Sequence, residues 1–368
     1  MKLPMSYPPI TSYNNQAALL GAISHTNDGM KYYYNHFIQL YVNIIGHKKK
    51  LCFRDDLSSF YKADSNRYYH FYNPFFEEYN IVENFLLFFP VEEIGEFIKR
   101  SIDDGFYINL YLDRKLFESN IHTEISAHEK HFYHDCIVYG YNEKFFYLVD
   151  FVGPGGKFDF SKISHSNFIK SYKKNEKNRK NHKIQEQFVD LFKTYNQAVV
   201  DIPLYIEKLF MFKIRNVKYD LDLKLILTAL KDYYYSSNVL NAYEFINANE
   251  KELGGKIVQG MDVYDELFLK DDMGVYAMNN MFTLKDHKKA QFDRCTYLLE
   301  NGYISDNWIV SRAELLYHES QLLLNLSIKY GITQDSAIKE KIRQKLQQMK
   351  DIEKSLLEVL IVELSDTV

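Results

Sequence analysis

Two residues whose side chains can take part in acid–base catalysis stand at the two ends of one short segment of this sequence. The segment reads HDCIVYGYNEKFFYLVD, with His134 at its start and Asp150 at its end. Two apolar runs flank a polar turn at 142–144, which predicts a β-hairpin. Because the outer ends of a hairpin are neighbours, the imidazole and the carboxylate are expected to meet. Such a pair is a general base with its orienting group, although a surface histidine and a turn aspartate give the same pattern.

Three further side chains near the hairpin are rivals for a chemical role. His128 and His131 both precede the apolar run. His131 is too far before that run to stand in register with Gly140, so His134 is the preferred base. Cys136 lies two residues after His134 and therefore on the same strand face, where it would suit a metal or redox pair. A free buried cysteine is the commoner case, and we expect it here.

The elements before the hairpin are read from apolar spacing and from end signals. Residues 14–24, NNQAALLGAIS, predict a short buried helix capped by Asn14 or Asn15. Residues 28–43 predict a second helix, since apolar side chains recur there at helical spacing. An amphipathic helix is expected at 91–105 and a strand at 106–113. A helix therefore comes first, and the strands with the histidine and the aspartate follow.

This order resembles that of papain-like cysteine enzymes. GFYINLYLD followed by HDCIVYGYNEKFFYLVD looks like the C39-type core, and the resemblance covers roughly residues 10–155. It is similar to the acyltransferases typified by the butirosin enzyme, which moves an acyl group from a carrier protein to an amine. The amide synthase of closthioamide formation is similar in concept. The resemblance implies an α+β fold, with a papain-like domain followed by an all-α domain.

The resemblance also implies an activity and a set of roles. An acyl group would pass from a phosphopantetheine thioester on an acyl or peptidyl carrier protein, through a cysteine acyl-enzyme, to a small amine in antibiotic or other secondary-metabolite biosynthesis. His134 would be the general base and Asp150 its orienting partner. No cofactor is implied beyond the phosphopantetheine that carries the substrate. Two other functions remain open: a C39-like cysteine peptidase, and a catalytically dead binding module of the same fold.

The nucleophile that the resemblance requires is missing from the start of the first helix. The segment SYNNQAALLGA contains no cysteine. One explanation is a cysteine-to-alanine variant with Ala17 as the changed position, which predicts that its β-carbon faces His134. A second is a natural pseudoenzyme. A third is that Ser12 or Cys52 is the nucleophile, the latter after the Lys-rich stretch HKKKLCF.

The amide side chains beside Ala17 are candidates for a second role. Asn14, Asn15 and Gln16 are amide donors near the helix start, where one of them, together with backbone N–H groups, would stabilise an oxyanion. Asn15 and Gln16 are the preferred oxyanion or substrate residues. Simple capping of the helix is the alternative for at least one residue of the Asn14–Gln16 group. No metal ligand is predicted, because the cysteines and histidines lack metal-site spacing.

The composition of the chain indicates its cellular compartment and disfavours some classes of binding partner. A formal net charge of −4 and a pI near 6.3 give no nucleic-acid signature. The longest apolar run, 85–91, is far too short to span a bilayer, and the prolines near the N-terminus disfavour a signal peptide. Three scattered cysteines indicate a reducing setting. We therefore expect a cytoplasmic protein with neither a nucleic-acid nor a membrane partner.

The second half of the chain changes in character. Residues 1–160 are expected to form the papain-like domain, residues 161–185 a basic linker, and residues 186–368 an all-α domain. The basic run Lys170–Lys183, KSYKKNEKNRKNHK, is read as solvated, or as a dock for an acidic carrier protein. Two long antiparallel helices are predicted at 306–331 and 337–364. The helical domain would wall off a substrate channel or form a homodimer.

Overall fold

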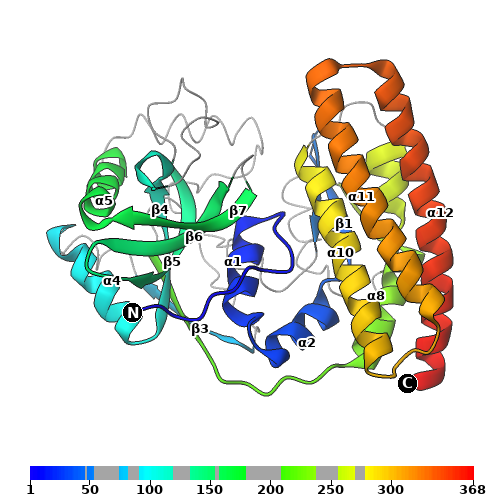
Figure 1. Cartoon of the computed structure of the whole chain (residues 1–368), viewed down its shortest axis with the longest axis horizontal. Helices are drawn as coiled ribbons and strands as arrows, with labels where there is room; N and C mark the ends of the chain where they lie inside the picture. The colour runs from blue at the N-terminus through cyan, green and yellow to red at the C-terminus, as the bar shows by residue number, and fades with distance from the viewer. Residues whose placement is uncertain are drawn as a thin grey trace. The chain divides into compact units, whose positions relative to one another are not determined.

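The protein is a mixed α+β molecule with antiparallel sheets (Figure 1). The computed structural model describes residues 1–45, 48–53, 74–81, 91–118, 133–153, 157–179, 209–237, 256–269 and 278–368. The chain divides into two compact units. Unit 1 consists of residues 1–29 and 56–218, and unit 2 of residues 30–55 and 219–368. The α+β class is confirmed, while the papain-like assignment stays a prediction.

Unit 1 is built on a six-stranded sheet in which every neighbouring pair is antiparallel. Its strand order is β3-β8-β4-β5-β6-β7. The strands are β3 (Phe76–Ile81), β4 (Phe106–Asp113), β5 (Tyr133–Tyr141), β6 (Phe145–Gly153), β7 (Lys157–Ser164) and β8 (Leu209–Ile214). The predicted strand at 106–113 and the predicted hairpin are confirmed.

Local chemistry explains why the hairpin forms where the sequence predicts it. The side-chain oxygen of Asn142 accepts hydrogen bonds from the backbone N–H groups of Lys144 and Phe145, which fixes the turn. At Gly140 the N-terminal residues run alongside β5, and an added β-carbon would lie 2.9 Å from the Met1 carbonyl oxygen. Glycine is therefore required there for the close approach of two backbones.

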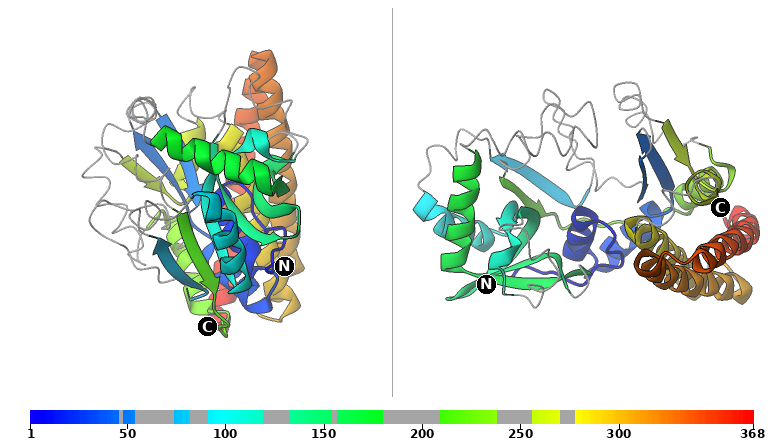
Figure 2. Two further views of the ribbon diagram at one scale, coloured as in Figure 1. Left: turned by 90° about the vertical axis from the view of Figure 1, so that its left-hand side faces the viewer. Right: turned by 90° about the horizontal axis from the view of Figure 1, so that it is seen from above.

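The helices of unit 1 pack around this sheet. Those in the described residues include α1 (Asn14–Ile23), α4 (Ile94–Asp103) and α5 (His165–Arg179), with 3-10 turns η2 (Val91–Glu93) and η3 (Arg114–Leu116). α1 contacts β5 and β6, whereas α4 and α5 contact β4 and each other (Figure 2). α4 buries Ile94, Ile98 and Ile102 along one side, and Gly105 follows it with φ +88°, as the helix prediction for this segment requires.

The prediction of a linker at 161–185 is wrong for the residues that the structure describes. β7 reaches Ser164 and α5 continues to Arg179. Phe168 and Ser171 are fully buried, and the Ser171 hydroxyl accepts a hydrogen bond of 2.7 Å from the backbone N–H of Asp113. Lys170 and Lys173 are exposed on the same helix that buries Phe168 and Ser171, so a high charge content did not indicate a solvated linker.

Unit 2 contains a smaller, three-stranded antiparallel sheet of order β2-β1-β9. Its strands are β1 (Leu40–Ile45), β2 (Lys48–Phe53) and β9 (Lys256–Gln259). The helix predicted at 28–43 is correct only over α2 (Asn27–His36), because the chain then enters β1. Pairing with β2 and with the distant β9 overrides the helical spacing of the apolar residues.

The other elements described in unit 2 are helical. They are α8 (Leu223–Tyr235), a π-helical turn η5 (Tyr264–Leu269), α10 (Met278–Glu300), α11 (Asn307–Thr333) and α12 (Ser336–Thr367). Figures 1 and 2 show α10, α11 and α12 side by side. The predicted pair of long C-terminal helices is confirmed, and Asp306 and Asp335 cap them. None of the helices in the described ranges has the length and apolar character needed to cross a membrane.

The boundaries predicted for the domains do not coincide with the two units. Residues 186–368 are not all-α, since β8 belongs to the sheet of unit 1 and β9 to the sheet of unit 2. Unit 2 also takes β1 and β2 from the first part of the chain. The prediction failed because these strands are short and pair with partners far away in sequence, which periodicity within one segment does not reveal.

Candidate active site

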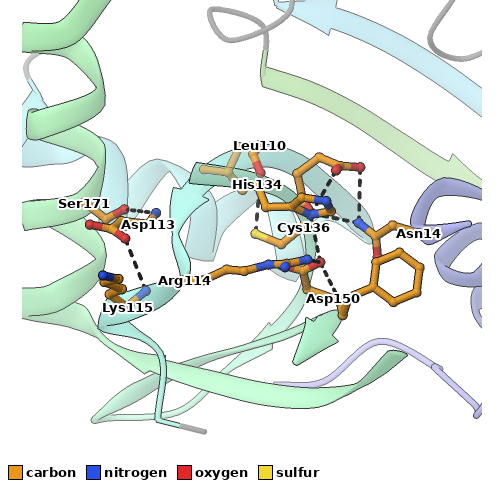
Figure 3. Close-up of polar contacts among 11 residues, drawn as sticks. Asn14, Leu110, Asp113, Arg114, Lys115, His134, Cys136, Asp150 and Ser171 are labelled. Atoms are coloured by element: carbon orange, nitrogen blue, oxygen red, sulfur yellow. Dashed lines mark hydrogen bonds and ion pairs between the residues drawn. The ribbon is translucent and has the colours of Figure 1, made fainter. Parts of the chain in front are cut away.

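The strand register of unit 1 brings His134 and Asp150 together. Ile137 pairs with Val149, so Cys136 and Asp150 are the next residues along β5 and β6. His134 lies two residues before Cys136 and therefore on the same face of β5. Its Nδ1 is 2.9 Å from Oδ1 of Asp150 (Figure 3). The predicted contact between the imidazole and the carboxylate is confirmed.

Asp150 is fully buried and held by several donors. Arg114, which is 8% exposed, donates from Nε to Oδ2 and from Nη2 to Oδ1, both at 2.6 Å. The backbone N–H of Phe151 also donates to Oδ1, at 2.6 Å. This two-point contact between a guanidinium and a carboxylate is the strongest form of ion pair and fixes the carboxylate plane. Sequence reasoning missed Arg114, although it follows directly after the strand that ends at Asp113.

His134 meets a second acidic residue, its own neighbour. Its Nδ1 is 3.1 Å from Oδ1 of Asp135 and 3.0 Å from the Asp135 carbonyl oxygen. Every one of these partners, including Asp150, is a hydrogen-bond acceptor, so Nδ1 must carry a hydrogen. In the neutral ring the lone pair is then on Nε2. The side chain of His134 is 28% exposed, so Nε2 is the atom that would act as a base.

The charges of the site set two pKa values in opposite directions. Burial lowers the pKa of His134, but the carboxylates of Asp150 and Asp135 outweigh it and raise the pKa above the ordinary value of 6.5. Burial raises the pKa of Asp150, but His134 and Arg114 outweigh it and hold the pKa below 3.8. Asp150 therefore stays ionised, and His134 takes up a proton readily near neutral pH.

The first helix reaches this cluster through Asn14. The N-cap of α1 is Tyr13, which makes no side-chain capping bond, so capping by Asn14 or Asn15 is not what starts the helix. Asn14 is its first residue, and Nδ2 donates to the Asp135 carbonyl oxygen at 2.7 Å and to Oδ2 of Asp135 at 3.1 Å. Figure 3 shows this side chain pointing toward His134 and away from its own helix. The sequence suggested Asn14 as a cap or as an amide donor to an oxyanion, and the structure instead engages its Nδ2 group with Asp135.

The other residues predicted on α1 follow Asn14. Asn15 is the second residue of the helix, and its side chain lies outside the described part of the structure. Gln16 is the third residue and is buried. Ala17 is the fourth and is fully buried. Its predicted contact with the His134 ring, and the oxyanion roles of Asn15 and Gln16, stay predictions.

The structure places the alternative nucleophiles and bases as follows. Cys136 is buried and its thiol donates to the Leu110 carbonyl oxygen at 3.4 Å, while burial raises its pKa well above 9.0. It is the free buried cysteine that was predicted. Because its thiol does not readily ionise, it is a poor nucleophile.

Cys52, the second alternative nucleophile, lies on β2 in unit 2. The Ser12 hydroxyl is buried and makes no hydrogen bond to His134. His128 and His131 lie outside the described residues.

The site can therefore bind and transfer a proton at His134 Nε2, with Asp150 orienting the ring. Within the described ranges no group of three or more His, Cys, Asp or Glu side chains could hold a metal ion. The comparisons with known proteins do not add to this chemistry. No protein-family model matches the chain, and no curated protein matches it either.

Proposed function

We propose that unit 1 is an amide-forming acyltransferase domain, in which His134 is the general base and Asp150 its orienting carboxylate. The observation that carries the proposal is the 2.9 Å contact between His134 Nδ1 and the fully buried Asp150, beside the first residue of α1. The acyl donor is a carrier-protein thioester and the acceptor a small amine, as the resemblance to C39-type acyltransferases implies. The dyad supplies the proton transfer that such a reaction needs.

The chemical step follows from the tautomer of His134. Nε2 accepts a proton from the amine nitrogen as that nitrogen attacks the thioester carbonyl carbon. A C–N bond forms and the C–S bond breaks. The proton then passes from Nε2 to the departing thiolate sulfur, which leaves a free phosphopantetheine thiol and an amide. Asp150 keeps the ring in the tautomer that has its lone pair on Nε2 and stabilises the transient imidazolium.

Direct attack by the amine is favoured over a cysteine acyl-enzyme in this chain. The thiol of Cys136 on β5 is buried against Leu110, and the start of α1, where the resemblance places the nucleophile, has no cysteine. The covalent route remains the alternative for a chain with cysteine restored on α1. Ala17→Cys and Asn14→Cys variants test it: intact mass after incubation with an acyl-pantetheine thioester reports which position forms an adduct. An adduct in either variant, lost on adding His134→Gln, supports the covalent route.

The experiment for the proposed function uses the full-length protein with an acyl-pantetheine thioester and a small primary amine. Mass spectrometry of the product measures amide formation. His134→Gln and Asp150→Asn are each expected to lower the rate at least about 100-fold, the usual contribution of general-base catalysis. His25→Gln is the matched control, since His25 is exposed in the same unit. Equal rates in the wild type and in His134→Gln would refute the proposal.

A non-catalytic binding module is the second candidate, and one observation favours it. Arg114 neutralises Asp150, as it would in a purely structural ion pair, so the imidazole gains less from the carboxylate. In this case a carrier protein or its acyl chain would bind without turnover. Saturable binding of an acyl-loaded carrier protein, with no amide formed from any amine tested, would support the module over the enzyme.

A further inference from the structure

In the side-chain amide of Asn14 the nitrogen has hydrogen-bond partners and the oxygen has none. The residue is 6% exposed. Both hydrogens of Nδ2 have acceptors, the carbonyl oxygen and the carboxylate of Asp135. The other amide atom, Oδ1, is buried and has no hydrogen-bond partner among the described residues. Toward any ligand, Asn14 can therefore act only as an acceptor.

The orientation of this amide is determined by its surroundings. If the group were turned over, Oδ1 would face two acceptor oxygens of Asp135 and the N–H₂ group would point the other way. That arrangement would replace two hydrogen bonds by two repulsive contacts. The unpartnered atom is consequently the oxygen. A buried carbonyl without a donor destabilises the folded protein, and native proteins keep few of them.

The charge around Asn14 favours a cationic donor. Asp135 and Asp150 bring two carboxylates, and Arg114 brings one guanidinium that pairs with Asp150. One negative charge therefore remains when the His134 ring is neutral. A protonated amine offers both a positive charge and N–H donors, whereas a trimethylammonium group of the same charge offers no N–H donor.

We propose that Oδ1 of Asn14 accepts a hydrogen bond from an N–H of the acyl acceptor, so that Asn14 selects primary amines. This inference rests on the proposed function, since it assigns the amine of that reaction to a position beside His134. Asp135 then has two tasks, because it anchors Asn14 and holds Nδ1 of His134. The bound ammonium must first lose one proton to solvent, because only the neutral amine has a lone pair for the attack. The neutral amine keeps an N–H on Oδ1, and His134 Nε2 takes its second proton as the C–N bond forms.

The test measures binding of butylamine and of butyltrimethylammonium to the full-length protein, by NMR titration of its histidine ring signals. The wild type is expected to bind butylamine more tightly. Asn14→Leu is expected to weaken butylamine binding about 3- to 10-fold, the usual effect of one hydrogen bond, and to leave butyltrimethylammonium unchanged. Asn167→Leu is the matched control, because the Asn167 amide also donates to a carbonyl oxygen, that of Leu116, away from the site.

A second variant keeps the test decisive if Asn14→Leu fails to fold. Asn14→Ala removes the same acceptor oxygen with a smaller side chain, so it is also expected to lose the preference for butylamine. Equal affinity of the wild type for the two ligands, or a preference that survives in folded Asn14→Leu or folded Asn14→Ala, would overturn the inference.

The outcomes separate this inference from the proposed function. If amide formation depends on His134 but the affinity for butylamine is the same with and without Asn14, the role of Asn14 is rejected. The proposed acyltransferase function is then still supported. Conversely, Asn14-dependent amine binding without amide formation from any thioester would support an amine-binding site and reject the acyltransferase.

Discussion

At the scale of single residues, the negative charge on Asp150 affects how the protonation of His134 depends on pH. Arg114 and His134 both contact this carboxylate, so the guanidinium satisfies it even when the imidazole is neutral. Without Arg114, a fully buried carboxylate would depend on a protonated His134 for its only cation. The ion pair thus allows His134 to lose its proton, which a general base must do before it can act.

The pH dependence of amide formation is the first prediction. A base must be neutral, and the pKa of His134 lies above 6.5, so kcat/KM should rise with pH through an inflection above 6.5. The stability contribution has the opposite sign. A raised pKa in the folded state stabilises the protein below the unfolded pKa, and this stabilisation is lost as pH rises through the folded pKa.

Asp135→Asn tests which charge raises that pKa. Removing the Asp135 carboxylate takes away one of the two interactions that favour the imidazolium, so the inflection should move to lower pH. NMR titration of the His134 ring measures the same shift in the absence of substrate. His25→Gln should leave the inflection in place. An inflection that stays fixed in Asp135→Asn would mean that Asp135 does not act on His134 as its geometry indicates.

At the scale of elements, local signals predicted well wherever a segment determines its own structure. The hairpin has a turn that Asn142 fixes through its own side chain, and β4 is apolar from Phe106 to Leu112 except at Asn109. By contrast, the region 28–43 changes from helix to strand after His36, because β1 pairs with β9 more than 200 residues later. No pattern inside that segment records such a partner.

The candidate site was predictable to the extent that it lies within the hairpin. His134 and Asp150 follow from alternation and turn position alone. Asn14 and Arg114 contact the hairpin from other elements, α1 and η3, and their roles depend on tertiary packing. An arginine directly after a strand that neighbours the hairpin was the available signal for Arg114. For Asn14 the sequence offered the preference of asparagine for helix starts and a place among the amide donors there, but no sign of its contact with Asp135.

Helix α5 provides the prediction at this scale. Ser171 is fully buried, and its hydroxyl accepts the 2.7 Å hydrogen bond from the Asp113 backbone N–H at the end of β4. Ser171→Ala removes this acceptor and should lower the free energy of unfolding by about 1–3 kcal/mol, the cost of leaving a buried polar group unsatisfied. Urea denaturation measures the change. The control Ser166→Ala alters an exposed serine of the same helix. An equal effect of both variants would show that α5 is not docked through Ser171.

At the scale of the whole molecule, the chain builds each unit from separate stretches. The sheet of unit 1 receives β8 between β3 and β4, and unit 2 receives β1 and β2 from the first part of the sequence. Non-local pairing of this kind is slow to form, because loop closure precedes the contacts that reward it. Charge composition misplaced the boundary at 161–185, because α5 continues unit 1 to Arg179 and exposes Lys170 and Lys173 while it buries Phe168.

Unit 2 encloses a charged pair in its interior. Lys288 on α10 and Glu353 on α12 form an ion pair, and both side chains are 0% exposed. Tyr264 donates to the other oxygen of Glu353 at 2.8 Å, and His287 Nδ1 lies 3.0 Å from the Lys288 amine. Burial lowers the pKa of Lys288 below 10.5, although Glu353 opposes this effect. The pair links the first and last of the three long helices.

A double-mutant cycle on this pair gives the last prediction. Lys288→Met leaves Glu353 buried without its cation, so the free energy of unfolding should fall by about 3–5 kcal/mol. Changing both residues, Lys288→Met with Glu353→Leu, removes the two charges together and should recover most of that loss. Urea denaturation followed by far-UV circular dichroism measures each variant. The control Glu314→Ala breaks an exposed pair with His318 and should change stability by less than about 1 kcal/mol. If the losses in free energy of unfolding of the two single variants add in the double variant, Lys288 and Glu353 do not interact energetically. The buried ion pair would then not be what joins α10 to α12.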